Sequence, residues 1–228
     1  MRFGVMSAMA EELAAVLEDL ALDDVVEAGG RRFHTGTLFG REAVLVSSRM
    51  GKVAAAVTAT MLLDRFACDA IVFTGVAGGA APGVEVGDVV IADRLIQHDL
   101  DASPIFPRYE VPLLGTATFD ADGELSDRAA AAAATVAPRV HRGLVASGDK
   151  FFASAAALAE LRARLPDVLA VEMEGAAVAQ VAFEHGAPFA VARAISDAAD
   201  HAAPGDFARF VATQPGPYAR AIERGALA

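Results

Sequence analysis

Short apolar runs alternate with helix-period segments along almost the whole chain, and this alternation constrains the fold more than any other feature. The apolar runs predict strands over Phe3–Met6, Arg32–Leu38, Glu42–Ser48, Ala70–Thr74, Val86–Ala92, Val140–Ala146, Val168–Val171 and Phe189–Ile195. The helix-period segments predict helices over Glu11–Leu20, Val53–Phe66, Leu125–Val136, Ser154–Leu165 and Glu174–His185, and a C-terminal helix that Asp206 caps and that runs past Ala221. This order favours an α/β fold with three α/β/α layers around a mixed central sheet. No linker divides the 228 residues, so we expect a single domain over residues 1–228.

The charge balance limits the partners that the chain can bind. Acidic residues number 30 against 19 basic ones, which gives a formal charge of −11 without any Lys or Arg cluster. A nucleic-acid surface needs the opposite balance, so we expect a small-molecule ligand and no nucleic-acid partner. No run of about 18 uncharged apolar residues occurs, which argues against a membrane span. The apolar run at the N-terminus is too short for a signal-peptide core, so we expect a cytoplasmic protein.

Metal and disulfide chemistry find little support in the sequence. Cys68 is the only cysteine, and the five histidines are scattered without an HxH or HxxxH pair. Neither an intramolecular disulfide nor a ligand set with metal spacing can be built from these residues. We therefore expect no metal and no cofactor.

The stretch Gln97–Gly115 contains three prolines among apolar residues such as Ile105, Phe106 and Leu113. Its prolines exclude a regular helix. An apolar loop of this length typically covers a binding site or contacts a partner subunit.

The ends of the predicted strands deserve the closest attention, because α/β folds bind ligands beyond the carboxyl ends of their strands. The glycines of Thr74–Gly79 allow the backbone to approach a ligand closely, although a tight strand-to-helix turn explains them equally well. Glu172 and Glu174 lie two residues apart, and such carboxylates can grip the two hydroxyls of a ribose. The alternative is a helix N-terminus, where the dipole favours acids.

Two further carboxylates have both a functional and a structural interpretation. Asp197 follows an apolar strand, where a partly desolvated carboxyl group has a raised pKa and can act as a general acid. It could equally cap a turn. Glu12 lies at the start of a predicted helix, where acidic residues are common for structural reasons.

Seven segments, taken in order, carry a specific resemblance. They are Gly4–Glu12, Met50–Ala55, Thr74–Gly79, Val86–Val90, Ser147–Asp149, Val171–Glu174 and Arg193–Asp197. Together they resemble the purine nucleoside phosphorylase/uridine phosphorylase superfamily, and within it most closely the 5′-methylthioadenosine/S-adenosylhomocysteine nucleosidases. The resemblance implies a phosphorylase/hydrolase-like fold, a homodimer and hydrolysis of an adenine nucleoside.

The resemblance also implies the catalytic roles. Asp197 would protonate adenine N7, with Ser196 holding its carboxyl group, and Glu12 would activate the attacking water. Hydrolysis with inversion needs such an acid and base on opposite faces of the glycosidic bond. The acid needs a raised pKa and the base an ordinary one, so their surroundings are expected to differ.

The remaining implied roles concern substrate binding. Glu174 would bind the ribose hydroxyls beside Glu172, and Met173 would pack under the ribose. Phe151 would stack on adenine, and the backbone of Phe152 would read the purine edge. The other implied pocket residues are Ala77 and Gly78 on the water side, Val76 in the same segment, and Met9, Met50 and Phe207 around the 5′-thio group.

Two departures from the resembled family keep alternatives open. Val76 stands where relatives often have serine, and it cannot hydrogen-bond phosphate, which favours hydrolysis. Arg49 stands where a small residue is usual, and it could bind phosphate or pair with a surface carboxylate. A phosphorylase and a non-catalytic nucleoside-binding protein are therefore alternatives. Candidates for closing a partner's 5′ pocket are Ala102, Ile105, Phe106, Tyr109 and Pro112, and the sequence leaves the 5′ substituent open.

Overall fold

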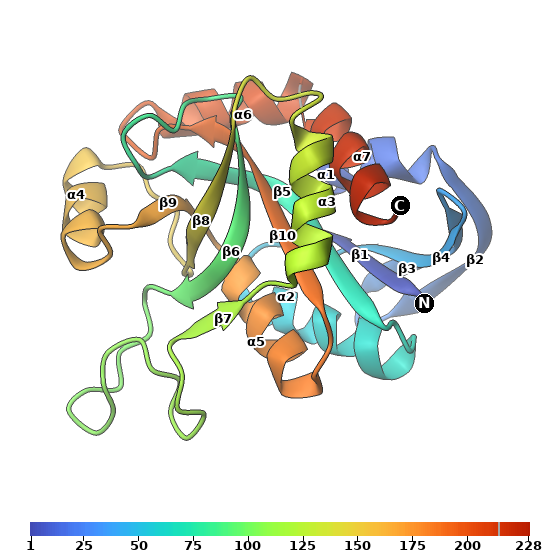
Figure 1. Ribbon diagram of the computed structural model, residues 1–228, viewed down its shortest axis with the longest axis horizontal. Coiled ribbons are helices and arrows are strands. Elements are labelled where there is room, and N and C mark those ends of the chain that lie inside the picture. Colours follow the sequence, from blue (N-terminus) through green and yellow to red (C-terminus); the bar gives the residue numbers. More distant parts are fainter. Residues whose placement is uncertain (214) are drawn as a thin grey trace.

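One mixed sheet forms the centre of the protein (Figure 1), which a computed structural model describes over residues 1–213 and 215–228. Within these residues its strands are β1 (Phe3–Ser7), β2 (Leu20–Ala28), β3 (Arg31–Leu38), β4 (Arg41–Ser47), β5 (Ala70–Gly79), β6 (Val89–Gln97), β7 (Thr118–Asp120), β8 (Val140–Ser147), β9 (Val168–Glu172) and β10 (Phe189–Asp197). The helices are α1 (Ala10–Leu17), α2 (Lys52–Thr60), the π-helical turn η1 (Met61–Arg65), α3 (Gly123–Ala133), α4 (Ala155–Arg164), α5 (Gly175–His185), α6 (Ala203–Thr213) and α7 (Pro215–Ala226).

The sheet closes on itself around β5. Its order is β10-β6-β8-β9-β5-β1-β4-β3-β2, and an additional pairing joins β10 to β5. Strand β5 is parallel to β1 and β10 and antiparallel to β9, so the mixed sheet that the sequence predicts is confirmed. The carboxyl ends of β1, β5 and β10 therefore lie close together, which prepares one edge of the sheet for a site.

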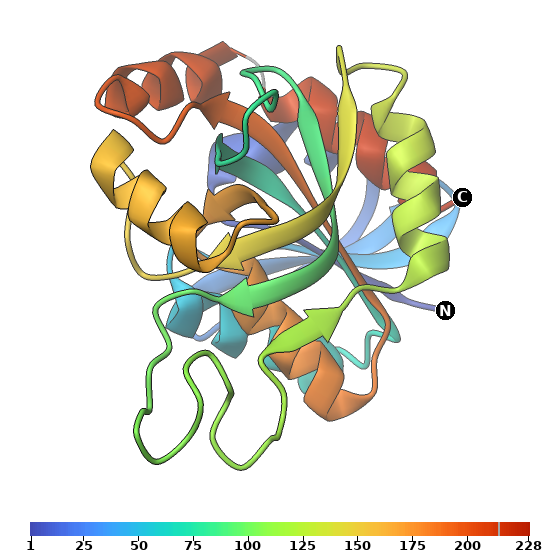
Figure 2. The same cartoon turned by 60° about the vertical axis from the view of Figure 1, so that its left-hand side comes forward.

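Helices cover both faces of the sheet, as Figures 1 and 2 show. Met6 and Phe73 pack with residues of α2 and α5 in one core cluster, whereas Val5 and Val72 pack with residues of α1, α3 and α7 in another. Neighbouring residues of a strand point to opposite faces, so one apolar run serves two cores. Helices packed on both faces of the sheet give the three-layer arrangement. Strands buried on both faces in this way are continuously apolar, which is why they appear as apolar runs in the sequence.

Strand β2 is absent from the sequence-based assignment, which instead extended the first helix to Leu20. The helix ends at Leu17, and β2 begins at Leu20. This strand carries Asp23 and Asp24 and is mostly exposed at the sheet edge. Edge strands bury little apolar surface, so they lack the alternating pattern by which strands are found in a sequence.

Other boundaries also differ from expectation. Strand β5 continues to Gly79 and is followed by β6, so the strand ends later than expected and the alternative of a strand-to-helix turn at the glycines is wrong. Strand β6 begins at Val89 and not at Val86, because Gly87 adopts a φ of +92° and the backbone turns there. The short strand β7 was not predicted.

The C-terminal region contains two described helices instead of one. Asp206 lies inside the first turn of α6 and does not cap it, so the predicted cap is wrong. An acidic side chain in the first turn is still favourable because of the helix dipole. Among the described residues, no helix is long and apolar enough to cross a membrane.

The loop between β6 and β7 contains neither helix nor strand, as its prolines predict. It projects from the lower edge of the sheet in Figures 1 and 2. Ile105 and Leu113 in this loop are 82% and 92% exposed. Large apolar side chains left in water to this extent mark a surface that a partner can cover.

Candidate active site

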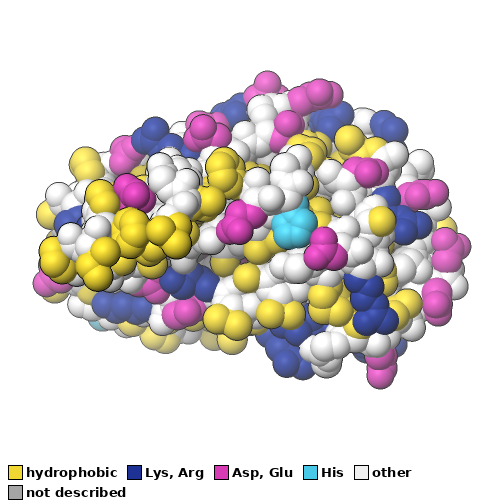
Figure 3. All heavy atoms as spheres, turned by 90° about the horizontal axis from the view of Figure 1, so that it is seen from below, with side chains coloured by type: hydrophobic (Ala, Val, Ile, Leu, Met, Phe, Trp, Pro, Cys, Tyr) yellow, Lys and Arg dark blue, Asp and Glu magenta, His cyan; other side chains and the backbone are white. Residues whose placement is uncertain are grey.

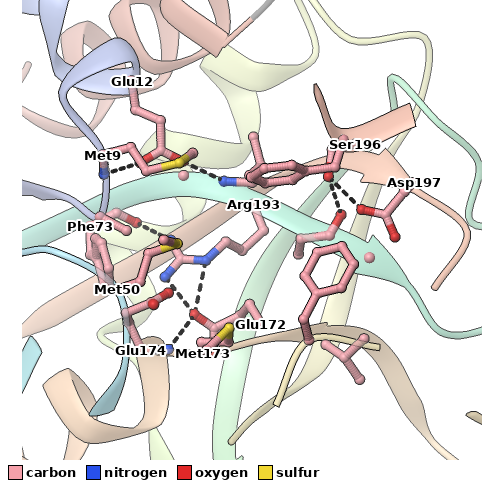
Figure 4. Close-up of a pocket in the computed structure, with 18 residues that line it drawn as sticks. Met9, Glu12, Met50, Phe73, Glu172, Met173, Glu174, Arg193, Ser196 and Asp197 are labelled. Carbon is pink, nitrogen blue, oxygen red and sulfur yellow. Dashed lines mark hydrogen bonds and ion pairs between the residues drawn. The ribbon is translucent and has the colours of Figure 1, made fainter. Parts of the chain in front are cut away.

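A pocket lies where the carboxyl ends of β1, β5, β9 and β10 meet (Figure 4). All but one of the site residues expected from the sequence line it: Met9, Glu12, Met50, Val76, Ala77, Gly78, Phe151, Glu172, Met173, Glu174, Ser196, Asp197 and Phe207. Figure 4 shows Glu12 and Asp197 at opposite ends of the pocket, with Arg193 between them. The site thus presents two separated carboxyl groups to whatever occupies it.

The carboxyl group of Asp197 is held by short-range hydrogen bonds at the end of β10. Ser196 Oγ donates to its Oδ2 at 2.8 Å, and the Ala199 N–H donates to its Oδ1 at 2.9 Å. The side chain is buried, and burial raises its pKa although these hydrogen bonds oppose the shift. Asp197 therefore keeps its proton to a higher pH than a free aspartic acid, as a general acid requires.

Glu12 is fixed at the start of α1, facing β5. The Met9 N–H donates to its Oε2 at 2.8 Å, and the Val76 N–H donates to its Oε1 at 3.0 Å. Burial raises the pKa of Glu12, while these N–H groups and the charge of Arg193 oppose the rise. The expectation that the base has an ordinary pKa is therefore wrong, because the side chain is as buried as the proposed acid.

Two glycines of β5 make room for these carboxyl groups. A Cβ atom at Gly75 would lie 3.1 Å from Glu12 Oε1, and one at Gly78 would lie 3.0 Å from Asp197 Oδ1. Both separations are tighter than ordinary contacts between carbon and oxygen. The glycine run therefore serves the placement of the two carboxyl groups and not a turn.

Glu172 and Arg193 form a buried ion pair at the floor of the pocket. Arg193 Nη2 and Nε donate to Glu172 Oε2 at 2.8 and 3.2 Å, and the guanidinium lies 4.0 Å from the centroid of the Phe73 ring. Ser147 Oγ and the Gly175 N–H also donate to Glu172. Because protein donors occupy both of its oxygens, Glu172 supports the site from behind and has little capacity left for a ligand.

Glu174 differs from Glu172, because only one of its carboxyl oxygens accepts a hydrogen bond from a described protein group. Its Oε1 accepts a hydrogen bond of 2.7 Å from the Gly51 N–H, and no described protein group donates to its Oε2. Burial and then the charge of Glu172 raise the pKa of Glu174 to about 7. One carboxyl oxygen thus remains available to a ligand, and Glu172 and Glu174 do not act as a matched pair.

Apolar side chains form the mouth of the pocket. Phe151 and Phe207 meet edge to face with centroids 5.7 Å apart, and Met50 is 61% exposed. Phe152 is the expected residue that does not line this pocket, because its ring is buried against His98. Phe152 and Phe151 together line a smaller hollow beside the pocket, with Met173 and Asp197.

Arg193 is the functional residue that the sequence analysis passed over. It belongs to the quoted segment Arg193–Asp197 but received no role. An arginine inside an apolar strand is itself a signal, because a buried charge requires a buried partner. The identity of that partner, Glu172 on another strand, needs the three-dimensional structure.

Arg49 lies outside the pocket. Its backbone has a φ of +71°, and its Nη2 donates to the Gly30 carbonyl oxygen at 2.6 Å. It lines a separate open hollow with Arg31 and Met50. No described carboxylate pairs with Arg49, so the surface ion pair weighed for it does not form.

Comparison with known proteins agrees with this geometry. The family model described as the phosphorylase superfamily matches residues 2–220. The 5′-methylthioadenosine/S-adenosylhomocysteine nucleosidase of Streptococcus pneumoniae, solved with a transition-state inhibitor, is 36% identical with a TM-score of 0.93, over 100% of this chain and 98% of that chain. The Neisseria meningitidis nucleosidase with methylthio-immucillin-A is 36% identical with a TM-score of 0.94, over 99% and 98%.

A third similar structure has a different name. It is a futalosine hydrolase mutant of Helicobacter pylori, 30% identical with a TM-score of 0.90, over 98% of this chain and 97% of that chain. The resemblance drawn from the seven sequence segments is confirmed. This chain belongs to the phosphorylase superfamily and is a nucleoside enzyme close to its 5′-methylthioadenosine/S-adenosylhomocysteine nucleosidases.

Proposed function

We propose that this protein is a hydrolase that cuts the N-glycosidic bond of 5′-thio-substituted adenosines, 5′-methylthioadenosine or S-adenosylhomocysteine, and releases adenine. One observation carries the proposal: two buried carboxyl groups, Asp197 and Glu12, face one pocket from opposite ends, and burial raises the pKa of both. Inverting hydrolysis of a glycosidic bond needs such an acid and base with room for water between them. Similar proteins solved with adenosine analogues support the substrate class.

On the acid side, Asp197 gives its proton to N7 of adenine. Protonation makes adenine a neutral leaving group, so the C1′–N9 bond breaks while positive charge develops on the ribose. Ser196 and the Ala199 N–H hold the carboxyl group in place during this transfer. The electron pair of the broken bond leaves with adenine.

On the base side, Glu12 takes a proton from the attacking water, and the resulting hydroxyl group bonds to C1′. The positive charge of Arg193 acts on Glu12 and favours its ionised, proton-accepting form. Glu174 offers its free oxygen to the ribose hydroxyls. The overall reaction consumes one water and yields adenine and the 5′-thio-substituted ribose.

The other side chains that line the pocket suit the base, the ribose and the 5′-thio group of such a nucleoside. Phe151 and Met173 line the pocket, which supports stacking of the Phe151 ring on adenine and packing of Met173 under the ribose, and we expect the Phe152 backbone to contact the purine edge. Met9, Met50 and Phe207 provide an apolar, partly sulfur-lined surface for the 5′-thio group. Val76 lies beside Glu12, on the side from which water would attack, whereas Gly78 lies against Asp197 and not on the water side expected for it, and Ala77 stands between them.

Phosphate should not be needed for the reaction. Val76 has no hydroxyl group, Arg49 lies outside the pocket, and Arg193, which lines the pocket, is already paired with Glu172, so none of these three described side chains offers phosphate a free ligand. We expect equal rates of adenine release from 5′-methylthioadenosine and S-adenosylhomocysteine with and without phosphate. Because one similar structure is a futalosine hydrolase, the same assay should include a futalosine-type nucleoside, so that its rate can be compared with the rates for the other two substrates. Release only with phosphate would identify a phosphorylase, and binding without release would identify a nucleoside-binding protein.

We propose further that the protein is a homodimer whose loop between β6 and β7 closes the partner's pocket. Figure 3 shows apolar side chains gathered on the face from which this loop projects. Exposed Ile105 and Leu113 on the loop, and Met50 and Val53 near the pocket mouth, would be covered in such a dimer.

Replacing Ile105 with Asp should therefore produce monomers and raise the KM for the nucleoside severalfold. The charge would have to be buried at the interface, which costs more than an isolated apolar contact contributes. Sedimentation at several protein concentrations measures the association state. Leu22→Asp is the matched control, since Leu22 is 54% exposed on the distant edge strand β2. A dimeric Ile105→Asp protein with unchanged KM would exclude this role for the loop.

A further inference from the structure

Two arginines, Arg31 and Arg49, are anchored on the turn between β2 and β3. Arg31 Nη1 donates a hydrogen bond of 2.7 Å to the Gly29 carbonyl oxygen, and Arg49 Nη2 donates one of 2.6 Å to the Gly30 carbonyl oxygen. Arg31 Nη2 also donates to the Ala54 carbonyl oxygen on α2 at 3.1 Å. The fold therefore holds two guanidinium groups on consecutive carbonyl groups of one turn.

No described carboxylate forms an ion pair with either arginine. Arg31 is only 9% exposed, and burial followed by the charge of Arg49 lowers its pKa, whereas a carboxylate beside it would raise that pKa. Arg49 is exposed, and a single described group accepts a hydrogen bond from its guanidinium. A guanidinium has several N–H donors, so most donors of Arg49 are available to an anion.

The two arginines line an open hollow that adjoins the proposed active site. Met50 lines both the hollow and the pocket. Gly51 lines the hollow and donates its N–H to Glu174 of the pocket at 2.7 Å. The hollow measures about 430 Å³, which is room for several non-hydrogen atoms, since one water takes up about 30 Å³ in the liquid. A ligand group that extends past Met50 out of the pocket therefore meets the two guanidinium groups.

One carboxylate, Asp149, lines the same hollow. Its Oδ1 accepts a hydrogen bond of 2.8 Å from the Lys52 N–H at the start of α2, and no described group donates to its Oδ2. An α-amino acid group carries a carboxylate and an ammonium group on one carbon atom, so it matches a hollow that offers both signs of charge. The other side chains of the hollow beyond Met50 are apolar and belong to Val53, Ala54 and Val57.

The backbone of Arg49 indicates that this side chain is placed at a cost. Its φ of +71° lies in the left-handed region, which favours glycine and which bulky residues rarely adopt. A Cβ atom at Gly30 would lie 2.7 Å from Arg49 Nη2, so the glycine leaves space for the guanidinium. Strained residues of this kind cluster at ligand sites.

The proposed function determines which part of a nucleoside reaches the hollow. With adenine N7 at Asp197 and the ribose hydroxyls at Glu174, the 5′ substituent lies at the end of the pocket away from Asp197, where Figure 4 shows Met50. A methylthio group ends at this point. The tail of S-adenosylhomocysteine continues beyond its sulfur and ends in an α-amino acid group.

We propose that the hollow is a subsite for the amino-acid end of the 5′ substituent, in which Arg49, beside Arg31, binds the carboxylate and Asp149 binds the ammonium group. The inference rests on the proposed function for the orientation of the nucleoside. It assigns to S-adenosylhomocysteine contacts that 5′-methylthioadenosine cannot make.

The first experiment compares Arg49→Gln with Arg32→Gln in adenine release from S-adenosylhomocysteine and from 5′-methylthioadenosine. In Arg49→Gln the ratio of the two kcat/KM values should fall about tenfold, through a higher KM for S-adenosylhomocysteine, because hydrogen bonds to a charged group are lost. Arg32→Gln removes the same charge at an exposed neighbouring position outside the hollow and should leave the ratio in place. An unchanged ratio in folded Arg49→Gln, or an equal fall in Arg32→Gln, would overturn the proposal.

Further variants test the chemistry of the subsite. Arg49→Gly should show the same fall and remain folded, because glycine adopts the left-handed φ without strain. Asp149→Asn keeps an acceptor for the Lys52 N–H but loses its charge, so the ratio should fall severalfold. A nucleoside with an uncharged 5′-butylthio group should respond to none of these changes. A butylthio substrate that loses as much as S-adenosylhomocysteine, or a ratio that rises in Asp149→Asn, would contradict recognition of an amino-acid group.

Binding and association measurements separate this inference from the proposed function. In an Asp197→Asn background, calorimetric titration should show that Arg49→Gln lowers the affinity for S-adenosylhomocysteine about tenfold relative to that for 5′-methylthioadenosine. If no adenine is released by the wild type but this difference is found, the proposed function fails and the subsite stands. If adenine is released and the difference is absent, the subsite fails. Sedimentation that shows a changed association state of Arg49→Gln, with selectivity unchanged, would assign Arg49 to a contact between two copies of the chain and overturn the proposal.

Discussion

The Asp197→Asn protein should release adenine at least about 10²–10⁴ times more slowly than the wild type while remaining folded. Asparagine has nearly the same shape and can still accept the Ala199 N–H, but it has no acidic proton to give to adenine. Single-turnover adenine release measures the chemical step, and calorimetric titration with the substrate measures binding. We expect the loss to lie in the chemical step, with binding changed little.

The thermal stability of the Asp197→Asn protein distinguishes the loss of a catalytic proton from a loss of folding. Folding raises the pKa of Asp197, so the carboxyl group contributes stability below its unfolded pKa and loses that contribution as the pH rises through the folded pKa. Asparagine is always neutral and carries no such penalty, so the variant should melt no lower than the wild type at neutral pH. Asp167→Asn, at an exposed position, is the control. Near-normal turnover in folded Asp197→Asn protein would remove Asp197 from the role of acid.

The Glu12→Gln protein should also lose about 10²–10⁴-fold in kcat, for the opposite reason. Glutamine cannot take a proton from water. Wild-type kcat/KM should fall as the pH drops through the raised pKa of Glu12, since the protonated form is inactive. The variant should lack this acid limb, and pH–rate profiles of both proteins provide the test.

The same substitution carries a structural cost that must be measured separately. Two N–H groups donate to the two oxygens of Glu12, and glutamine has only one acceptor oxygen for them. An unsatisfied buried N–H costs about 1–3 kcal/mol, so the variant should also melt at a lower temperature. Glu11→Gln, at the exposed neighbouring position on α1, controls for a change of charge. An acid limb retained by active Glu12→Gln protein would show that another group is the base.

The sequence predicts those features of the fold and the site that arise from local patterns, and it misses those that arise from contacts between segments far apart in the chain. Strands buried on both faces, such as β10, are local apolar runs, and their ends correctly locate the pocket. Strand β2 was missed because its exposed, acidic residues carry no apolar alternation. The Glu172–Arg193 pair joins residues on β9 and β10 that are not sheet neighbours, so no local pattern reveals that Glu172 is already occupied.

The raised pKa of Glu12 could not be predicted for a similar reason. At the start of a helix an acidic residue is usually solvated, and only the packing of α1 against the sheet buries this one. The roles of the carboxyl groups came from the resemblance, whereas their environments come from the tertiary structure.

The two glycines of β5 set the distance between the places where the two carboxyl groups of the site pack. Glu12 rests against Gly75 and Asp197 against Gly78, three residues further along the same strand. A strand rises about 3.3 Å per residue, so the main chain sets a spacing of roughly 10 Å between these two supports. A one-residue insertion or deletion between the glycines would change this spacing by about 3.3 Å. Both carboxyl groups are held by hydrogen bonds from backbone N–H groups, so a change of rotamer that restored the spacing would break those hydrogen bonds. The length of this strand segment, and not only the identity of the two acids, is therefore under functional constraint.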